Sequence, residues 1–172
     1  MAKIEELVQE LEQEARTTRR TLARIPEDRL GWRPHATSMT LAELAGHIAT
    51  LPALVTDMAT WPKFDVETSN EEIRASRPTA ASVMDALEMH DRSVAQAKAA
   101  LAGMDDGALA EPWRMVRGDE EVGTIPRGAL FRSALFSHWY HHRGQLTVYL
   151  RMTGVAVPAI YGDSADEPAF PV

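Results

Sequence analysis

The 172-residue chain contains no cysteine, so disulfides, thiolate metal ligands and a cysteine nucleophile are all excluded. It also lacks an apolar run near the ~20 residues that a membrane-spanning helix requires. Its first residues, MAKIEELVQELEQEA, are acidic and amphipathic, which is unlike a secretory signal. We therefore expect a protein of the reducing cytoplasm, without a membrane segment.

The chain also has no excess of positively charged residues. The formal net charge is −7, which argues against general binding of nucleic acids or anionic membranes. A local pocket for a small anionic ligand stays compatible with this balance. Apolar residues make up 45% and charged residues 25%, an ordinary composition for a globular protein. We expect residues 1–172 to form a single domain with a full-sized core.

Apolar residues recur at helical spacing in four segments, and neither a strand pattern nor an internal repeat accompanies them. Thr40 and Glu43 fit a capping box at the start of the second segment. Pro52 should kink that helix, because it has no N–H to bond residue 48. We expect the third helix to start near Thr79 and Thr124 to cap the fourth. The predicted helices span about residues 2–24, 40–59, 79–102 and 126–153.

These four helices predict an all-α four-helix bundle with long connections. A tail with three prolines, from Val155 onward, should wrap the surface. The connection over residues 60–78 is polar, and residues 103–124 are rich in glycine and charge. The lengths of the connections leave the order of the helices around the bundle open.

The fourth segment contains two histidines, His138 and His142, one helical turn apart. At 100° per residue they share a stripe that should face the core. A buried imidazole needs a partner, which is either a metal ion or a hydrogen-bond acceptor on another helix. The stripe contains Phe131, Ala134, Leu135, His138, His142, Gln145, Tyr149 and Met152.

A third histidine, His47, lies on the inward half of the second segment. Three neutral imidazoles and one open position suit a divalent ion such as Zn²⁺ or Ni²⁺ in a catalytic arrangement. Histidines satisfied by hydrogen bonds are the alternative, because HxxxH spacing alone is a weak signal. The sequence HWYHH is not the HExxH of zinc proteases, since Trp139 replaces the catalytic glutamate.

Two segments carry a resemblance to a known family. The segment SHWYHHRGQLTVYLRMTGVAVPAIYG resembles the C-terminal helix of the DinB/YfiT-like superfamily of metalloenzymes, with its H-x-x-x-H-R-G-Q-L core. The segment LGWRPHATSMTLAELAGHIA resembles the family's second-helix motif. The resemblance implies a four-helix bundle, often a dimer, with a divalent metal bound by His47, His138 and His142. Characterised members of the family include thiol-dependent S-transferases and a mycothiol-dependent isomerase.

Five further polar side chains are candidates for the pocket or for supporting the ligands. His141 could replace His142 as a ligand, or it could face solvent or a partner chain. His90 shares the inward face of the third helix, where a hydrogen-bonded core histidine is the simpler interpretation. Glu43 could orient an imidazole in addition to capping its helix. Gln145 and Tyr149 are either core or pocket groups.

The opposite side of the fourth helix is too apolar for a water-facing surface. It carries Phe136 and Tyr140, and it needs cover from another subunit or from the tail. We therefore expect a homodimer, with the tail as the alternative cover. Arg143 should lie on this outer side in a surface ion pair.

Three functions are compatible with such a site. The first is a thiol-dependent S-transferase, in which the ion activates an external low-molecular-weight thiol toward a small electrophile bound near Trp32 or Trp113. The second is a hydrolase in which the ion activates water. The third is a non-catalytic metal or ligand binder that acts in a stress response. The sequence does not separate the first two, and it identifies no catalytic acid or base.

Overall fold

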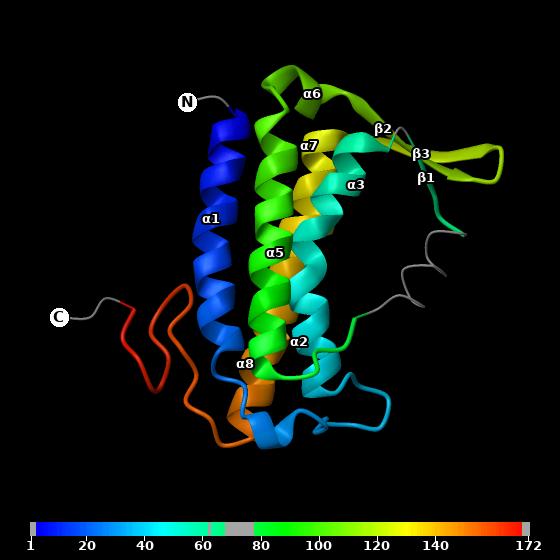
Figure 1. The fold of residues 1–172 in the computed structure, drawn as a ribbon. Helices are drawn as coiled ribbons and strands as arrows, with labels where there is room; N and C mark the ends of the chain where they lie inside the picture. The colour runs from blue at the N-terminus through cyan, green and yellow to red at the C-terminus, as the bar shows by residue number, and fades with distance from the viewer. Residues whose placement is uncertain (1–2, 62, 68–77, 170–172) are drawn as a thin grey trace.

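The computed structural model describes residues 3–61, 63–67 and 78–169, and four long helical elements dominate it (Figure 1). Two of the four are continuous helices, and two are built from shorter helical pieces joined end to end. The predicted four-helix bundle is thus confirmed. In chain order the elements are α1 (Lys3–Leu22), α2 (Leu41–Thr50) with the 3-10 turn η2 (Leu51–Ala53) and α3 (Leu54–Thr60), α5 (Val83–Ala102), and α7 (Arg127–Leu130) with the π-helix η3 (Phe131–Ser137) and α8 (His138–Met152).

The order of these elements around the bundle differs from their order in the chain. Helix α5 packs against both α1 and α2, and α8 packs against the same two helices. Helices α1 and α2, although consecutive, therefore lie diagonally opposite each other. In Figure 1 α1 and α8 run downward while α2 and α5 run upward, so the neighbours α2 and α5 are parallel. A parallel pair requires a long connection in the sequence between the end of α3 and the start of α5.

Local signals fix the second helix where the sequence predicts it. The Thr40 hydroxyl accepts a hydrogen bond from the backbone N–H of Glu43 at 3.2 Å, and the Glu43 carboxylate accepts one from the Thr40 N–H at 2.7 Å. This is the predicted capping box. At Pro52 the α-helix gives way to the 3-10 turn η2 and then resumes as α3, which confirms the predicted interruption.

Two predicted helix starts were wrong. Ser82, and not a residue near Thr79, caps α5 by accepting a hydrogen bond from the N–H of Asp85 at 3.0 Å. Thr124 does not cap the fourth helix, because it lies in a strand and the helix begins after Pro126. The predicted end of the third helix was correct, since Gly103 follows the last turn of α5.

The described chain also contains a small three-stranded sheet, which the expectation of an all-α fold missed. Strand β1 pairs in parallel with β2, and β2 pairs antiparallel with β3. Gly118 has a φ of +59° in the turn between β2 and β3, a conformation that glycine adopts without steric cost. The strands are β1 (Lys63–Asp65), β2 (Pro112–Arg117) and β3 (Glu120–Pro126), and the short helix α6 (Asp106–Ala110) precedes β2.

The apolar outer face of the fourth helix is covered within the chain itself. Phe136 is fully buried. The Tyr140 hydroxyl donates a hydrogen bond to Glu10 of α1 at 2.5 Å, and the ring of Tyr161 from the tail lies 6.0 Å away. Burial, with the nearby Glu10 carboxylate, raises the pKa of Tyr140. The argument for a partner subunit at this face therefore fails, and the homodimer stays a prediction without that support.

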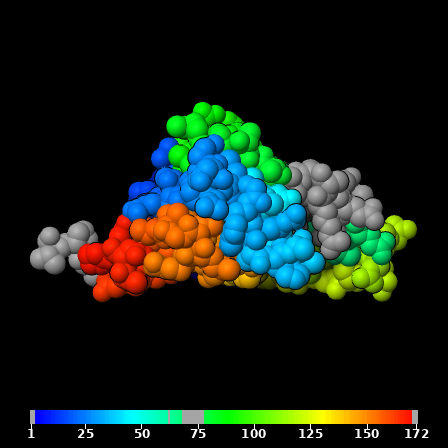
Figure 2. Space-filling model, turned by 90° about the horizontal axis from the view of Figure 1, so that it is seen from below, coloured from blue at the N-terminus to red at the C-terminus, as the bar shows by residue number. Residues whose placement is uncertain are grey.

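The tail was predicted to wrap the surface, and its described residues lie against the end of α1. The Arg20 guanidinium donates to the carbonyl of Ala159, and Arg24 pairs with Glu167. Seen from below, the tail and the end of α8 (orange to red) lie beside the connection between α1 and α2 (blue) (Figure 2). Within the described residues, no helix has the length and apolar character needed to cross a bilayer.

Candidate metal centre

Three histidines meet where α2 packs against α8. His47 lies in the second turn of α2, His138 is the first residue of α8, and His142 follows one turn later. The Nε2 atom of His138 lies 2.9 Å from that of His142 and 3.4 Å from that of His47. All three imidazoles are half-buried. The structure thus brings together the three histidines that the sequence singles out.

The separations fit a divalent cation. A tetrahedral Zn²⁺ ion with Zn–N bonds of about 2.0–2.1 Å holds its ligand nitrogens about 3.3 Å apart. The two measured separations bracket that value, and one donor atom from each of the three rings lies within 4.8 Å of the others. Neutral imidazoles that converge on one point repel one another through their lone pairs unless a proton or a cation lies between them. The donor set therefore suits a borderline divalent ion.

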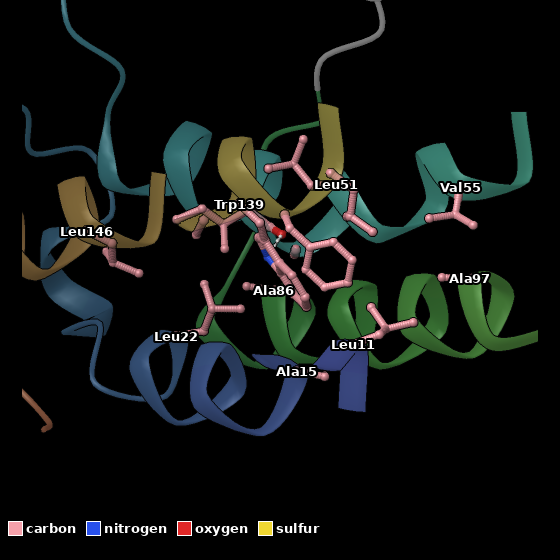
Figure 3. Close-up of a cluster of buried hydrophobic side chains, with 14 of the residues drawn as sticks. Leu11, Ala15, Leu22, Leu51, Val55, Ala86, Ala97, Trp139 and Leu146 are labelled. Atoms are coloured by element: carbon pink, nitrogen blue, oxygen red, sulfur yellow. Dashed lines mark hydrogen bonds between the residues drawn. The ribbon is translucent and has the colours of Figure 1, made fainter. Parts of the chain in front are cut away.

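Residues beside the histidines hold the two helices in place. The indole N–H of Trp139, which follows His138, donates a hydrogen bond of 3.0 Å to the carbonyl of Ile48, which follows His47 (Figure 3). Trp139 is fully buried in the core cluster. The bond joins α8 to α2 at the level of the histidines, so the core sets the distance between His47 and His138.

The π-helix η3 ends directly before His138. A π-helix has more residues per turn than an α-helix, and π segments occur often at functional sites. The single stripe predicted at 100° per residue therefore breaks here. On α8 the fully buried side chains are Trp139, Arg143, Leu146 and Leu150, whereas Met152 of the predicted stripe is 56% exposed. The histidines lie on the half-buried face beside the core face.

Arg143 occupies that core face, which contradicts its predicted place on the surface. Its side chain is 1% exposed and forms an ion pair with Glu14 of α1. It also donates to the Thr18 hydroxyl at 2.9 Å and to the hydroxyl of Tyr161. The predicted ion pair is present, but it is buried, because the acidic partner Glu14 is buried with Arg143.

Gln145 contacts one of the three histidines, whereas Tyr149 packs against Trp32. The Oε1 atom of Gln145 is 2.7 Å from the Nδ1 atom of His142. Tyr149 is buried, and its ring meets that of Trp32 edge to face with 5.5 Å between centroids. Trp32 is half-buried at the loop end of the bundle. Trp113 is 4% exposed among the strands at the other end of the bundle (Figure 1), so it cannot line this site.

The remaining candidates have separate surroundings. His141 is exposed, with its ring 4.9 Å from that of His142. His90 is 2% exposed, lies 6.0 Å from the ring of Trp139, and contacts Asp91 through Nδ1 at 3.2 Å. Burial lowers the pKa of His90. It is therefore a core histidine beside the site, and the described residues offer its Nε2 atom no hydrogen-bond partner.

A surface cavity of about 430 Å³ opens beside the start of α2. Its lining is mainly polar and includes Arg33, Thr37, Ser38 and Glu43. Glu43 lies one helical turn before His47, although no histidine lines the cavity itself. The sequence contained no clear signal for this hollow, because it forms where the loop before α2 meets Pro78 and Thr79.

The profile described as DinB family matches residues 1–170. The chain belongs to the DinB family. Among curated proteins, this DinB chain is 39% identical over 64 residues to the uncharacterized protein YrdA of Bacillus subtilis (strain 168). That match covers 35% of the chain and 38% of YrdA, so it spans little more than a third of that relative.

Solved structures share the fold of this DinB protein. A DinB-like protein from Bacillus cereus ATCC 10987 matches with a TM-score of 0.67 at 22% identity, over 89% of this chain and 94% of that one. A second match is YfiT from Bacillus subtilis, which is described as a probable metal-dependent hydrolase with an unusual four-helix bundle topology. Its TM-score is 0.63 at 14% sequence identity, over 89% of each chain. A mycothiol-dependent maleylpyruvate isomerase matches with a TM-score of 0.56 at 15% sequence identity, over 90% of this chain but only 62% of that one.

Proposed function

We propose that this protein is a divalent metal-dependent enzyme whose bound ion activates a small nucleophile, with hydrolysis as the leading reaction. The observation that carries the proposal is the convergence of the Nε2 atoms of His47, His138 and His142 at 2.9–3.4 Å. Three protein ligands leave a tetrahedral ion one open position, the arrangement of catalytic rather than structural zinc sites. Zn²⁺ or Ni²⁺ is the expected ion, one per chain.

The chemistry follows from the charge of the ligand set. A divalent ion in this site supplies a Lewis acid that makes a water or thiol in the open position more acidic. The three ligands are neutral imidazoles, so the chain does not offset the charge of the ion there. Half-burial of the rings keeps the open position within reach of solvent and of a small substrate.

Side chains at the loop end of the bundle offer a place for the substrate. The buried Tyr149 and the half-buried Trp32 form an aromatic wall at the loop end of the bundle. Aromatic walls with a few polar groups are typical of small-molecule sites. We assign the apolar part of the substrate to this wall and a polar part to the cavity that Arg33 and Ser38 line.

Hydrolysis leads because YfiT, described as a probable metal-dependent hydrolase, has the same fold over nearly its whole length. A thiol reaction is the second candidate. The mycothiol-dependent isomerase shares this fold over 62% of its own length, and a chain without cysteine needs an external thiol for such chemistry. An S-transferase would use the same open position for the thiol.

Activity assays can separate these candidates. The metal-loaded protein is compared with the metal-free protein and with the His142→Ala variant, on ester and amide substrates and on small electrophiles with a range of thiols. The proposal predicts turnover only in the metal-loaded parent, with ester or amide cleavage identifying a hydrolase. Equal rates in all three samples would refute it. Metal binding without turnover on any substrate would leave a metal-binding protein that is not an enzyme.

A further inference from the structure

The side chain of Gln145 contacts His142, one of the proposed ligands, on the side of the ring that faces away from the triad. Its Oε1 atom lies 2.7 Å from the Nδ1 atom of His142, while the Nε2 atom of the same ring lies 2.9 Å from that of His138. Both nitrogens of His142 are thus engaged, one inside the triad and one outside it. A neutral imidazole carries a single N–H, so the two contacts need opposite roles.

We propose that Gln145 is a positioning residue that holds His142 in its Nδ1–H tautomer and leaves the Nε2 lone pair directed into the triad. The amide oxygen of Gln145 can only accept, so Nδ1 donates and Nε2 has no proton. That is the form in which an imidazole binds a metal through Nε2. This inference rests on the proposed metal site and deepens it.

The helix α8 holds Gln145 beside the ring of His142. Residues three apart lie on the same face of a helix, so Gln145 can reach the ring of His142 without a backbone change. The neighbours Arg143 and Leu146 are buried in the core, at 1% and 0% exposure. Their packing fixes the rotation of α8 about its axis. The orientation of the imidazole is therefore set before any ion binds.

An amide here has a different consequence from a carboxylate. Ligand histidines commonly donate their second N–H to a carboxylate, a carbonyl or water, and a carboxylate makes the ligand more basic. The neutral Gln145 orients the ring without adding negative charge. The site then keeps the full charge of the ion for the nucleophile. Gln145→Glu should accordingly hold the metal at least as tightly as the parent does.

The tautomer can be measured directly in the metal-free protein. Long-range ¹H–¹⁵N correlation spectra of the imidazoles, recorded at about pH 8 where unperturbed imidazoles are neutral, distinguish Nδ1–H from Nε2–H. Loss of signals in His142→Gln identifies the ring of His142. We expect Nδ1–H in the parent and in Gln145→Glu. In Gln145→Leu we expect a shift toward Nε2–H, the form that free histidine prefers.

Metal affinity supplies the second readout. Titration with Co²⁺ should show binding about 10–100-fold weaker in Gln145→Leu, the usual effect of removing such a partner. Thr147→Val is the matched control on the same helix, because its hydroxyl bonds the backbone carbonyl of Gly144 and no histidine. Gln145→Ala repeats the test without a branched side chain, and thermal unfolding of the metal-free variants verifies the fold.

The proposal requires both changes in Gln145→Leu and neither in Thr147→Val. An unchanged tautomer, an unchanged affinity or an equal loss in the control would each overturn it. Failure of the metal site itself looks different, because His142→Gln would then bind Co²⁺ as tightly as the parent. The tautomer spectra, which involve no metal, separate the two failures.

Discussion

The indole of Trp139 completes a hydrogen bond that Pro52 removes. In a regular helix the carbonyl of Ile48 would accept from the N–H of residue 52, but proline has none. The Trp139 N–H takes its place at 3.0 Å. One helix interruption thus creates the acceptor that joins α2 to α8 beside the histidines. The hydroxyl of Ser93 on α5 bonds the next carbonyl, that of Ala49.

This relationship predicts non-additive effects of two substitutions. Trp139→Phe should destabilise the metal-free protein by about 1–3 kcal/mol for the unsatisfied carbonyl, and more for the lost volume. Pro52→Ala restores an N–H that can bond Ile48. The cost of Trp139→Phe should therefore be smaller in the Pro52→Ala background. Urea unfolding of the four proteins measures the coupling, and simple additivity would mean that the indole and the restored N–H do not share the carbonyl of Ile48.

The buried ion pair of Arg143 with Glu14 predicts that stability depends on keeping both partners. Both side chains are buried, so Glu14→Gln leaves a buried charge without its partner, at a cost on the order of 3 kcal/mol. Arg143→Met in the same chain should recover part of that loss. Glu12→Gln is the control, because the pair of Glu12 with Lys98 is exposed and should matter little. Equal losses at both positions, by denaturant unfolding, would contradict the buried pair.

Two helical glycines should respond in opposite directions to alanine. A Cβ atom on Gly46 would lie 2.3 Å from the carbonyl oxygen of Pro78, and backbone on both sides limits adjustment. Gly46→Ala should cost about 1–3 kcal/mol. A Cβ atom on Gly144 would meet nothing within 4 Å, so Gly144→Ala should stabilise α8 by up to about 1 kcal/mol. Melting temperatures of the metal-free proteins verify both signs.

His90 predicts a pH dependence of stability. Burial is the main cause of its lowered pKa, against the opposing effect of Asp91, so the folded state favours the neutral ring. Below about pH 6.5 the unfolded chain binds the proton more readily. The stabilisation is therefore complete above that pH and lost as the pH falls through the folded pKa.

The test compares the parent with His90→Gln, both without metal so that the triad binds no ion. The free energy of unfolding of the parent should fall more steeply between about pH 7.5 and pH 5. Asp91 on α5 contacts the ring, and Arg19 on α1 pairs with Asp91. Parallel curves for the two proteins would show that His90 is protonated equally well in both states.

Helical periodicity and capping residues were enough to predict most of the bundle. Spacing in HWYHH, with the family motifs, selected the histidines that meet in the structure. The strands β2 and β3 were missed because glycine and charged residues in this segment were taken as signs of a loop. Their turn is a single Gly-Asp pair between WRMVR and EEVGTIP. That Gly-X pair, between residues of alternating burial, is a recognised hairpin signal and could have been used.

Other features had no local signal. The π-helix before His138 changes the helical phase, and no residue in FRSALFS marks it. Arg143 was misplaced because its partner, Glu14, lies 129 positions away. The parallel packing of α2 and α5 involves helices that are separated in the chain by a long connection. The last two features involve contacts between distant segments, which periodicity in one segment cannot reveal.

The metal content of the purified protein tests the central claim most directly. The parent, produced without a histidine tag and under metal-replete conditions, should contain about one divalent ion per chain by elemental analysis. His47→Ala, His138→Ala and His142→Ala should contain little. His141→Ala, one residue from a proposed ligand, should keep the ion. If the three triad variants retain as much metal as the parent, His47, His138 and His142 are not its ligands.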